Sequence, residues 1–216
     1  MIDIVNEIDA IHREVAEEAS PAGTVRTVRL ERDLDAPVAD VWDALTNPER
    51  IGRWFLPISG DYRLGGTYQF EGNAGGEILE CDRPNRLKVT WVYGEMGGDT
   101  PASTVEIRLS AVDPERTRFD FEHKAIVPEE MWDQFGPGAV GVGWDGGLLG
   151  LALHLRGGSI ADPEAWQVSD EGREFYRTSS RAWGEASRAA GADAETVARN
   201  VANTTTFYAP DPNAVP

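Results

Sequence analysis

The chain has 216 residues, of which 37 are acidic and 20 are basic, so its formal charge is −17. This charge argues against nucleic acid and anionic membranes as partners, because both select clusters of Lys and Arg. One cysteine and three histidines, far apart in the sequence, exclude a disulfide within the chain and predict that it holds no metal.

The first segment predicts an amphipathic helix over residues 2–19. One apolar stripe recurs there at helical spacing, formed by Ile4, Ile8, Ile11 and Val15. The sequence Pro21-Ala22-Gly23 ends the pattern. We interpret residues 1–23 as an N-terminal helix that packs on the body of the protein or on a second subunit.

From Thr24 the apolar period changes to two, which predicts a strand as far as Leu34. Two short helices are expected next, over residues 38–46 and from Pro48 to about Trp54. Five further strands, separated by turn signals, are expected over residues 67–71, 77–81, 87–93, 103–112 and 116–124. Strands joined by such short turns pair as an antiparallel meander with one buried face and one wet face.

Residues 128–142 are expected to be irregular, and Gly143–Leu155 predicts a long helix with Trp144 and Leu148 on its apolar stripe. Four glycines in this helix each cost about 1 kcal/mol relative to alanine. We therefore expect close approach of the helix to the sheet, or space left beside it for a guest. Residues 157–209 predict a C-terminal helical extension, with helices over about 170–190 and after Asp193, and residues 210–216 a disordered tail.

This order of elements predicts an α+β fold, in which a curved antiparallel sheet of six to seven strands wraps the long helix. A curved sheet and a straight helix do not pack flush, so a cavity is expected between them. The main domain then covers residues 24–156, with additional helices at both ends.

Several motifs resemble one known family. The segments 30–37 and 41–46, with the later Trp54, resemble the opening signature of the START-like (SRPBCC) superfamily, and within it the bacterial homologues of the activator of heat-shock-protein ATPase. The pattern continues in order through Gly65-Gly66, Pro84, Leu87, Trp91 and Gly143-Trp144. The resemblance covers about residues 24–155 and implies a helix-grip fold with an internal cavity for hydrophobic or aromatic small molecules. The helices after Arg156 lie outside it.

Aromatic residues form the candidate ligand-binding site, because pockets combine apolar walls with a few polar groups. The candidates are Trp54, Tyr68, Phe70, Trp91, Tyr93, Phe119, His123, Trp132 and Trp144. Ordinary core packing is the alternative interpretation of the same residues. His123 is the titratable group with inward parity, and Asp145 or Tyr93 would assist it in acid–base chemistry. Cys81 is expected to be a packed, inert thiol.

Motifs for other chemistry are missing from the sequence. No Gly-Lys-Ser or Gly-Lys-Thr follows the glycines at 136–143, and Gly157-Gly158-Ser159 lacks the flanking glycine of a nucleophile elbow. We therefore expect no cofactor. The sequence has no apolar run of about 20 residues and no signal-peptide pattern at its start, which predicts a cytoplasmic protein without membrane contact.

Three functions fit these observations. The first is binding of a hydrophobic or aromatic small molecule in the cavity between sheet and long helix, without robust catalysis. The second is a polyketide cyclase/dehydratase-like enzyme, as implied by some superfamily relatives, with His123 as acid or base. The third is a protein-interaction, co-chaperone-like module, with a homodimer formed through the terminal helices. The sequence alone leaves open whether the protein is an enzyme.

Overall fold

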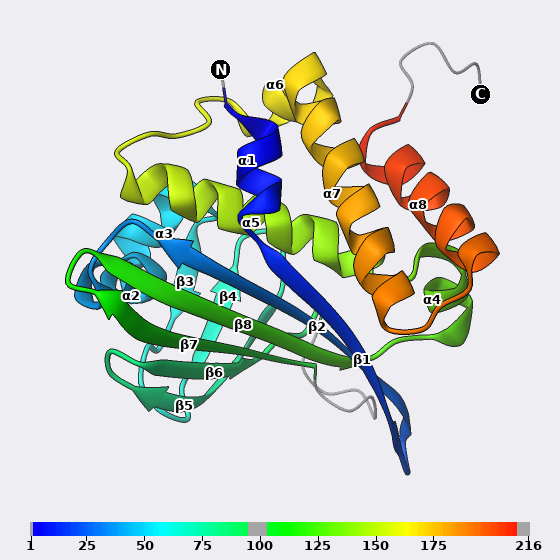
Figure 1. The fold of residues 1–216 in the computed structure, drawn as a ribbon. Coiled ribbons are helices and arrows are strands. Elements are labelled where there is room, and N and C mark those ends of the chain that lie inside the picture. Colours follow the sequence, from blue (N-terminus) through cyan, green and yellow to red (C-terminus); the bar gives the residue numbers. More distant parts are fainter. Residues whose placement is uncertain (1, 95–102, 211–216) are drawn as a thin grey trace.

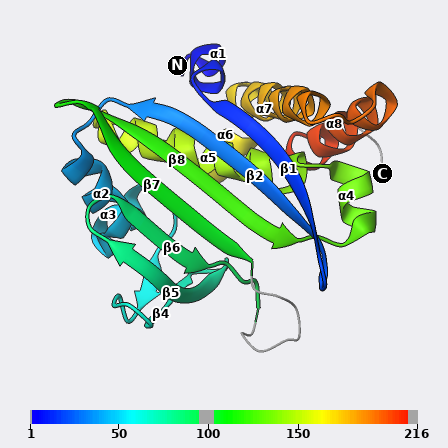
Figure 2. The ribbon, with the colours of Figure 1, turned by 60° about the horizontal axis from the view of Figure 1, so that its bottom comes forward.

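A computed structural model describes residues 2–94 and 103–210 of the chain (Figure 1). Its strands form one curled sheet in the order β1-β2-β8-β7-β6-β5-β4-β3, and each neighbouring pair is antiparallel (Figure 2). The strands are β1 (His12–Ser20), β2 (Gly23–Leu34), β3 (Ile58–Gly60), β4 (Thr67–Phe70), β5 (Gly75–Asp82), β6 (Arg86–Thr90), β7 (Thr104–Asp113) and β8 (Arg116–Ile126). The predicted α+β class and antiparallel sheet are confirmed, with eight described strands rather than six to seven.

The helices form two further layers. They are α1 (Ile4–Asp9), α2 (Val38–Thr46), α3 (Pro48–Trp54), α4 (Glu129–Phe135), α5 (Gly138–Leu155), α6 (Pro163–Val168), α7 (Asp170–Ala189) and α8 (Ala194–Tyr208). Helix α5 crosses the sheet, and α1, α6 and α7 lie on the side of α5 that faces away from the strands (Figure 1). Helices α2 and α3 lie at one end of α5. The long helix is therefore enclosed between the sheet and the terminal helices.

The single helix expected over residues 2–19 is wrong. Helix α1 ends at Asp9, and β1 then pairs with β2 along its whole length. The error arises because β1 is an edge strand whose side chains are mostly exposed, so pairing with β2 rather than an apolar alternation determines its conformation. The sequence Pro21-Ala22 is the two-residue turn of the β1–β2 hairpin, since Ser20 pairs with Gly23.

The long helix begins at Gly138 rather than Gly143, and α4 occupies part of the segment that the sequence predicts to be irregular. Two glycines of α5 lie against neighbouring helices, whereas Gly147 has only the Phe55 ring within 4 Å of its Cβ position and Gly146 has open space there. A Cβ on Gly141 would lie 2.3 Å from Cε2 of Trp183 on α7, and one on Gly150 would lie 2.5 Å from the carbonyl oxygen of Trp54 on α3. Close approach is thus to α7 and α3 rather than to the sheet.

Asp145 fixes α5 to its outer neighbours. The side chain is fully buried, and Arg13 of β1 donates to it from Nη2 at 2.9 Å and from Nε at 3.1 Å. Ser179 of α7 donates to the same carboxylate at 2.5 Å. Asp145 therefore sits on the face of α5 that is turned away from the sheet, and it does not assist His123 as the sequence suggested. The buried Asp145 carboxylate thus joins α5 to β1 through Arg13 and to α7 through Ser179.

The C-terminal helices are confirmed as elements. Helix α7 covers the expected 170–190 segment, and Asp193 caps α8 by accepting hydrogen bonds from the backbone N–H groups of Glu195 and Thr196. The expected linker before α7 contains the short helix α6. Of the tail expected over 210–216, residues 211–216 lie outside the described residues. None of the described helices is both long enough and apolar enough to cross a bilayer.

Candidate ligand cavity

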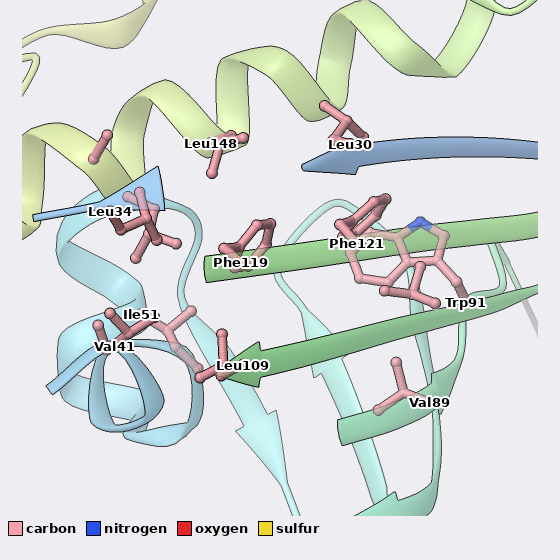
Figure 3. Packing of buried hydrophobic residues seen from close by; sticks show 14 of the residues in the cluster. Leu30, Leu34, Val41, Ile51, Val89, Trp91, Leu109, Phe119, Phe121 and Leu148 are labelled. Carbon is pink, nitrogen blue, oxygen red and sulfur yellow. The ribbon is translucent and has the colours of Figure 1, made fainter. Parts of the chain in front are cut away.

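A cavity of about 210 Å³ lies between the sheet and α5. Leu30 of β2 and Phe119 and Phe121 of β8 line it from the strands, and Trp144 and Leu148 line it from the helix. In Figure 3, Leu148 points from α5 toward the two phenylalanine rings. The hollow therefore lies where a curved sheet and a straight helix were predicted to leave one.

Helices α2 and α3 close one end of the cavity. Asn47 caps α3 by accepting from the backbone N–H of Glu49, and proline stands in its first turn, so the second helix begins directly after the first. Trp54 at the end of α3 donates from Nε1 to the carbonyl oxygen of Ala44 at 3.0 Å. This bond holds the Trp54 ring against the cavity, where Phe55 packs edge-on to Phe70 with ring centroids 5.0 Å apart.

The cavity meets the surface at the loop between β3 and β4. Tyr62, Arg63 and Leu64 border it there, and Leu64 is 64% exposed although its side chain is apolar. Cys81 of β5 also borders the cavity and is exposed. We call residues 62–64 the mouth of the cavity.

Two polar groups of the cavity wall are paired within the protein. Tyr68 donates its hydroxyl to the carbonyl oxygen of Thr90 at 2.6 Å, and burial raises the pKa of this phenol. Trp144 donates from Nε1 to Nδ1 of His123 at 3.0 Å. The side chains of Tyr68 and Trp144 therefore present aromatic carbon rather than a free donor to a guest inside the hollow. Across residues 2–94 and 103–210, no group of His, Cys, Asp and Glu side chains is arranged to hold a metal ion.

Most of the sequence candidates meet at this cavity. The lining includes Trp54, Tyr68, Phe70, Trp91, Phe119 and Trp144. Tyr93 does not line it and is 68% exposed, because β6 ends at Thr90 and the chain bends before Tyr93, which breaks the alternation. Trp132 lies on α4, where the Arg26 guanidinium stacks 4.7 Å from its ring. The inward placement predicted for Tyr93 is wrong.

His123 is buried behind Trp144 and is not part of the cavity wall. Its Nδ1 accepts the indole N–H, so the neutral ring carries its proton on Nε2, which faces the Ser103 hydroxyl at 2.6 Å. Burial lowers the pKa of His123 to about 4. The ring is therefore neutral near pH 7, and both of its nitrogens are engaged in holding Trp144 and Ser103.

This lowered pKa predicts a pH-dependent stability. Unfolded histidine takes up a proton near pH 6.5, whereas folded His123 does so near pH 4. Its contribution to the free energy of unfolding is therefore complete above pH 6.5 and is lost as the pH falls toward 4. By pH 5 we expect the free energy of unfolding to drop by about 2 kcal/mol from this residue. Urea unfolding of wild type and His123→Gln at pH 7 and pH 5 measures it. The variant should lose less stability than wild type over this interval, and equal losses would contradict the assignment.

Two parts of the site were missed from the sequence. Residues 62–64 show no apolar periodicity in the sequence, so nothing there indicated that they border a cavity. The prediction that Cys81 is packed is wrong, since its side chain is exposed at the cavity edge. The register of β5 shifts between Ile78 and Glu80, and this bulge turns Cys81 toward the cavity.

Comparison with known proteins gives a family and a fold. The family described as "Activator of Hsp90 ATPase homolog 1-like protein" matches residues 35–155. The crystal structure of CalU16 from Micromonospora echinospora is 34% identical and covers 85% of this chain and 99% of that chain, with a TM-score of 0.63. The solution structure of CalU16 gives a TM-score of 0.65 at 34% identity over 84% of this chain and 97% of that chain.

A more distant structure shares the fold alone. Protein MLL2253 from Mesorhizobium loti is 21% identical, with a TM-score of 0.53, and the match covers 62% of this chain and 100% of that chain. No curated protein gives a significant match.

Proposed function

This chain belongs to the Activator of Hsp90 ATPase homolog 1-like family of START-like proteins, and from that premise we propose that it binds an apolar or aromatic small molecule in the cavity between its sheet and α5. The observation that carries the proposal is the hollow of about 210 Å³ with walls of aromatic and aliphatic side chains. An engineered cavity of roughly 150 Å³ lined by Leu, Ile and Phe stays dry and binds benzene. A larger hollow of the same chemistry accommodates a guest larger than one benzene ring.

The same geometry favours binding without robust catalysis. Acid–base catalysis needs a titratable group within hydrogen-bond reach of the substrate. His123 lies behind Trp144 with both nitrogens engaged, and Asp145 lies on the opposite face of α5 in a pair with Arg13. The Tyr68 hydroxyl is bonded to a backbone carbonyl. The enzyme alternative with His123 would require Trp144 to leave its position.

The apolar faces of the terminal helices are largely covered by the chain itself. Ile4 and Ile8 pack in one cluster with Leu149 and Phe175, and Trp183 is fully buried. These faces therefore do not argue for a binding partner, which favours the small-molecule function over the co-chaperone-like one. A homodimer through the terminal helices stays a prediction, and light scattering of the full chain measures it.

Tryptophan fluorescence tests the proposal directly. Trp54, Trp91 and Trp144 line the cavity, so a bound aromatic guest should quench their emission. A guest that binds only the folded state should also raise the melting temperature with concentration. Titration with naphthalene, indole and phenylnaphthylamine should give saturable quenching and a higher melting temperature for at least one of them. Flat responses to all three would contradict the proposal.

A further inference from the structure

Arg63 is the one charged side chain among the described residues that line the cavity. It stands at the mouth, between Tyr62 and Leu64, and its side chain is 74% exposed. No carboxylate lines the cavity in the described ranges, although the chain as a whole carries a formal charge of −17. Arg63 is therefore the charged group closest to a guest, since its ion-pair partner Asp61 does not line the cavity.

Three polar groups of the interior are already paired within the protein. The Tyr68 hydroxyl and the indole N–H groups of Trp54 and Trp144 each donate to a protein acceptor, at 2.6, 3.0 and 3.0 Å. A polar substituent buried among these walls would lose its bonds to water without replacement, which costs free energy. A polar group of the guest is consequently better placed at the mouth, beside Arg63.

The guanidinium is positioned to receive an anion there. Its Nε donates to Oδ2 of Asp61 at 2.6 Å, and this bond holds the planar group beside the cavity. Its two Nη groups have no hydrogen bond to any residue of 2–94 or 103–210, and the side chain is mostly exposed. Two parallel N–H groups of an arginine match the oxygens of a carboxylate or sulfonate.

We propose that the guest is an apolar acid, whose ring or chain fills the hollow and whose single anionic group pairs with Arg63. This inference rests on the proposed function of the cavity and adds the chemical class of the ligand. Cationic guests are disfavoured because, of the Arg63–Asp61 pair, only the guanidinium lines the cavity. Neutral apolar guests fit the hollow but form no ion pair with Arg63 at the mouth.

Two fluorescent probes separate the contribution of the apolar walls to binding affinity from that of Arg63. Phenylnaphthylamine and anilinonaphthalene sulfonate share one aromatic body, and only the second carries a negative charge. Wild type should bind the sulfonate more tightly than the neutral probe, and Arg63→Gln should weaken sulfonate binding by about twofold to fivefold, as expected for an exposed ion pair. Binding of the neutral probe should be unchanged in the variant. Added salt should reduce the preference for the sulfonate.

Arg116→Gln is the matched control. Arg116 is also an exposed arginine that pairs with a nearby aspartate, Asp113, at 2.7 Å, but it does not line the cavity. Its removal changes the net charge equally and should leave both probes unaffected. Equal weakening by both variants, or no weakening by Arg63→Gln, would overturn the ligand class while the cavity still binds the neutral probe. Failure of the neutral probe to bind wild type would instead count against the proposed function, and the acid inference would fall with it.

Discussion

Replacing Asp145 with alanine is expected to destabilise the protein by about 3–5 kcal/mol, the largest effect anticipated for any side chain outside the apolar core. The carboxylate is fully buried, and its partner Arg13 has a side chain only 6% exposed. Removing the carboxylate leaves a guanidinium buried without its counter-charge and removes the acceptor of the Ser179 hydroxyl. Because the three residues come from β1, α5 and α7, the loss should loosen the layer of helices that covers α5.

Urea unfolding followed by circular dichroism measures this effect, with Asp113→Ala as the control. Asp113 also pairs with an arginine, at 2.7 Å, but both side chains are partly exposed. Exposed pairs contribute at most about 1 kcal/mol. Removing both charges together, in Arg13→Met with Asp145→Leu, should recover much of the stability lost by Asp145→Ala. A loss below about 1 kcal/mol for Asp145→Ala would contradict the assigned role of the pair.

Replacing Gly147 with leucine is expected to abolish binding of apolar guests without unfolding the protein. Gly147 lines the cavity on α5, and a Cβ placed there would meet only Phe55 Cε2 at 3.8 Å, so a larger side chain has room to enter the hollow. The substitution also replaces glycine in a helix, which gains up to about 1 kcal/mol of helix propensity. The cavity is then filled by the protein's own side chain.

Gly146→Leu is the control for this change. Gly146 precedes Gly147 on the same helix, does not line the cavity, and has no atom within 4 Å of its Cβ position. It should bind phenylnaphthylamine as wild type does, whereas Gly147→Leu should show no saturable binding and a melting temperature at least as high as that of wild type. Retained binding in Gly147→Leu would place the guest elsewhere on the protein.

The sheet and the cavity were predictable because their signal is local. Alternation such as Val28 and Leu30 in β2, or Phe119 and Phe121 in β8, shows which face of a strand is buried, and these residues are buried in the structure. The helical spacing of Trp144 and Leu148 likewise identified the helix that the sheet surrounds. The periodicity of apolar residues depends only on which face of an element is buried, so it can be recognised without knowing which residues pack against that face.

The remaining features depend on contacts between distant parts of the chain. Arg13 and Asp145 are 132 positions apart, and nothing in either neighbourhood indicates the other. β1 is defined by its pairing with β2, because an edge strand with exposed side chains carries no apolar pattern. The bulge that turns Cys81 toward the cavity and the bend that turns Tyr93 away from it each break the period of two. In both cases the strand itself was predicted, but the direction in which the side chain points was not.

A crystal structure of the protein grown with phenylnaphthylamine tests the central claim most directly. We predict that the probe lies between Phe119 and Phe121 of β8 and Trp144 and Leu148 of α5, with the bond between Trp144 and His123 intact. Probe bound only on the outer surface, or a hollow that stays vacant at saturating probe, would contradict the claim that this cavity is the binding site.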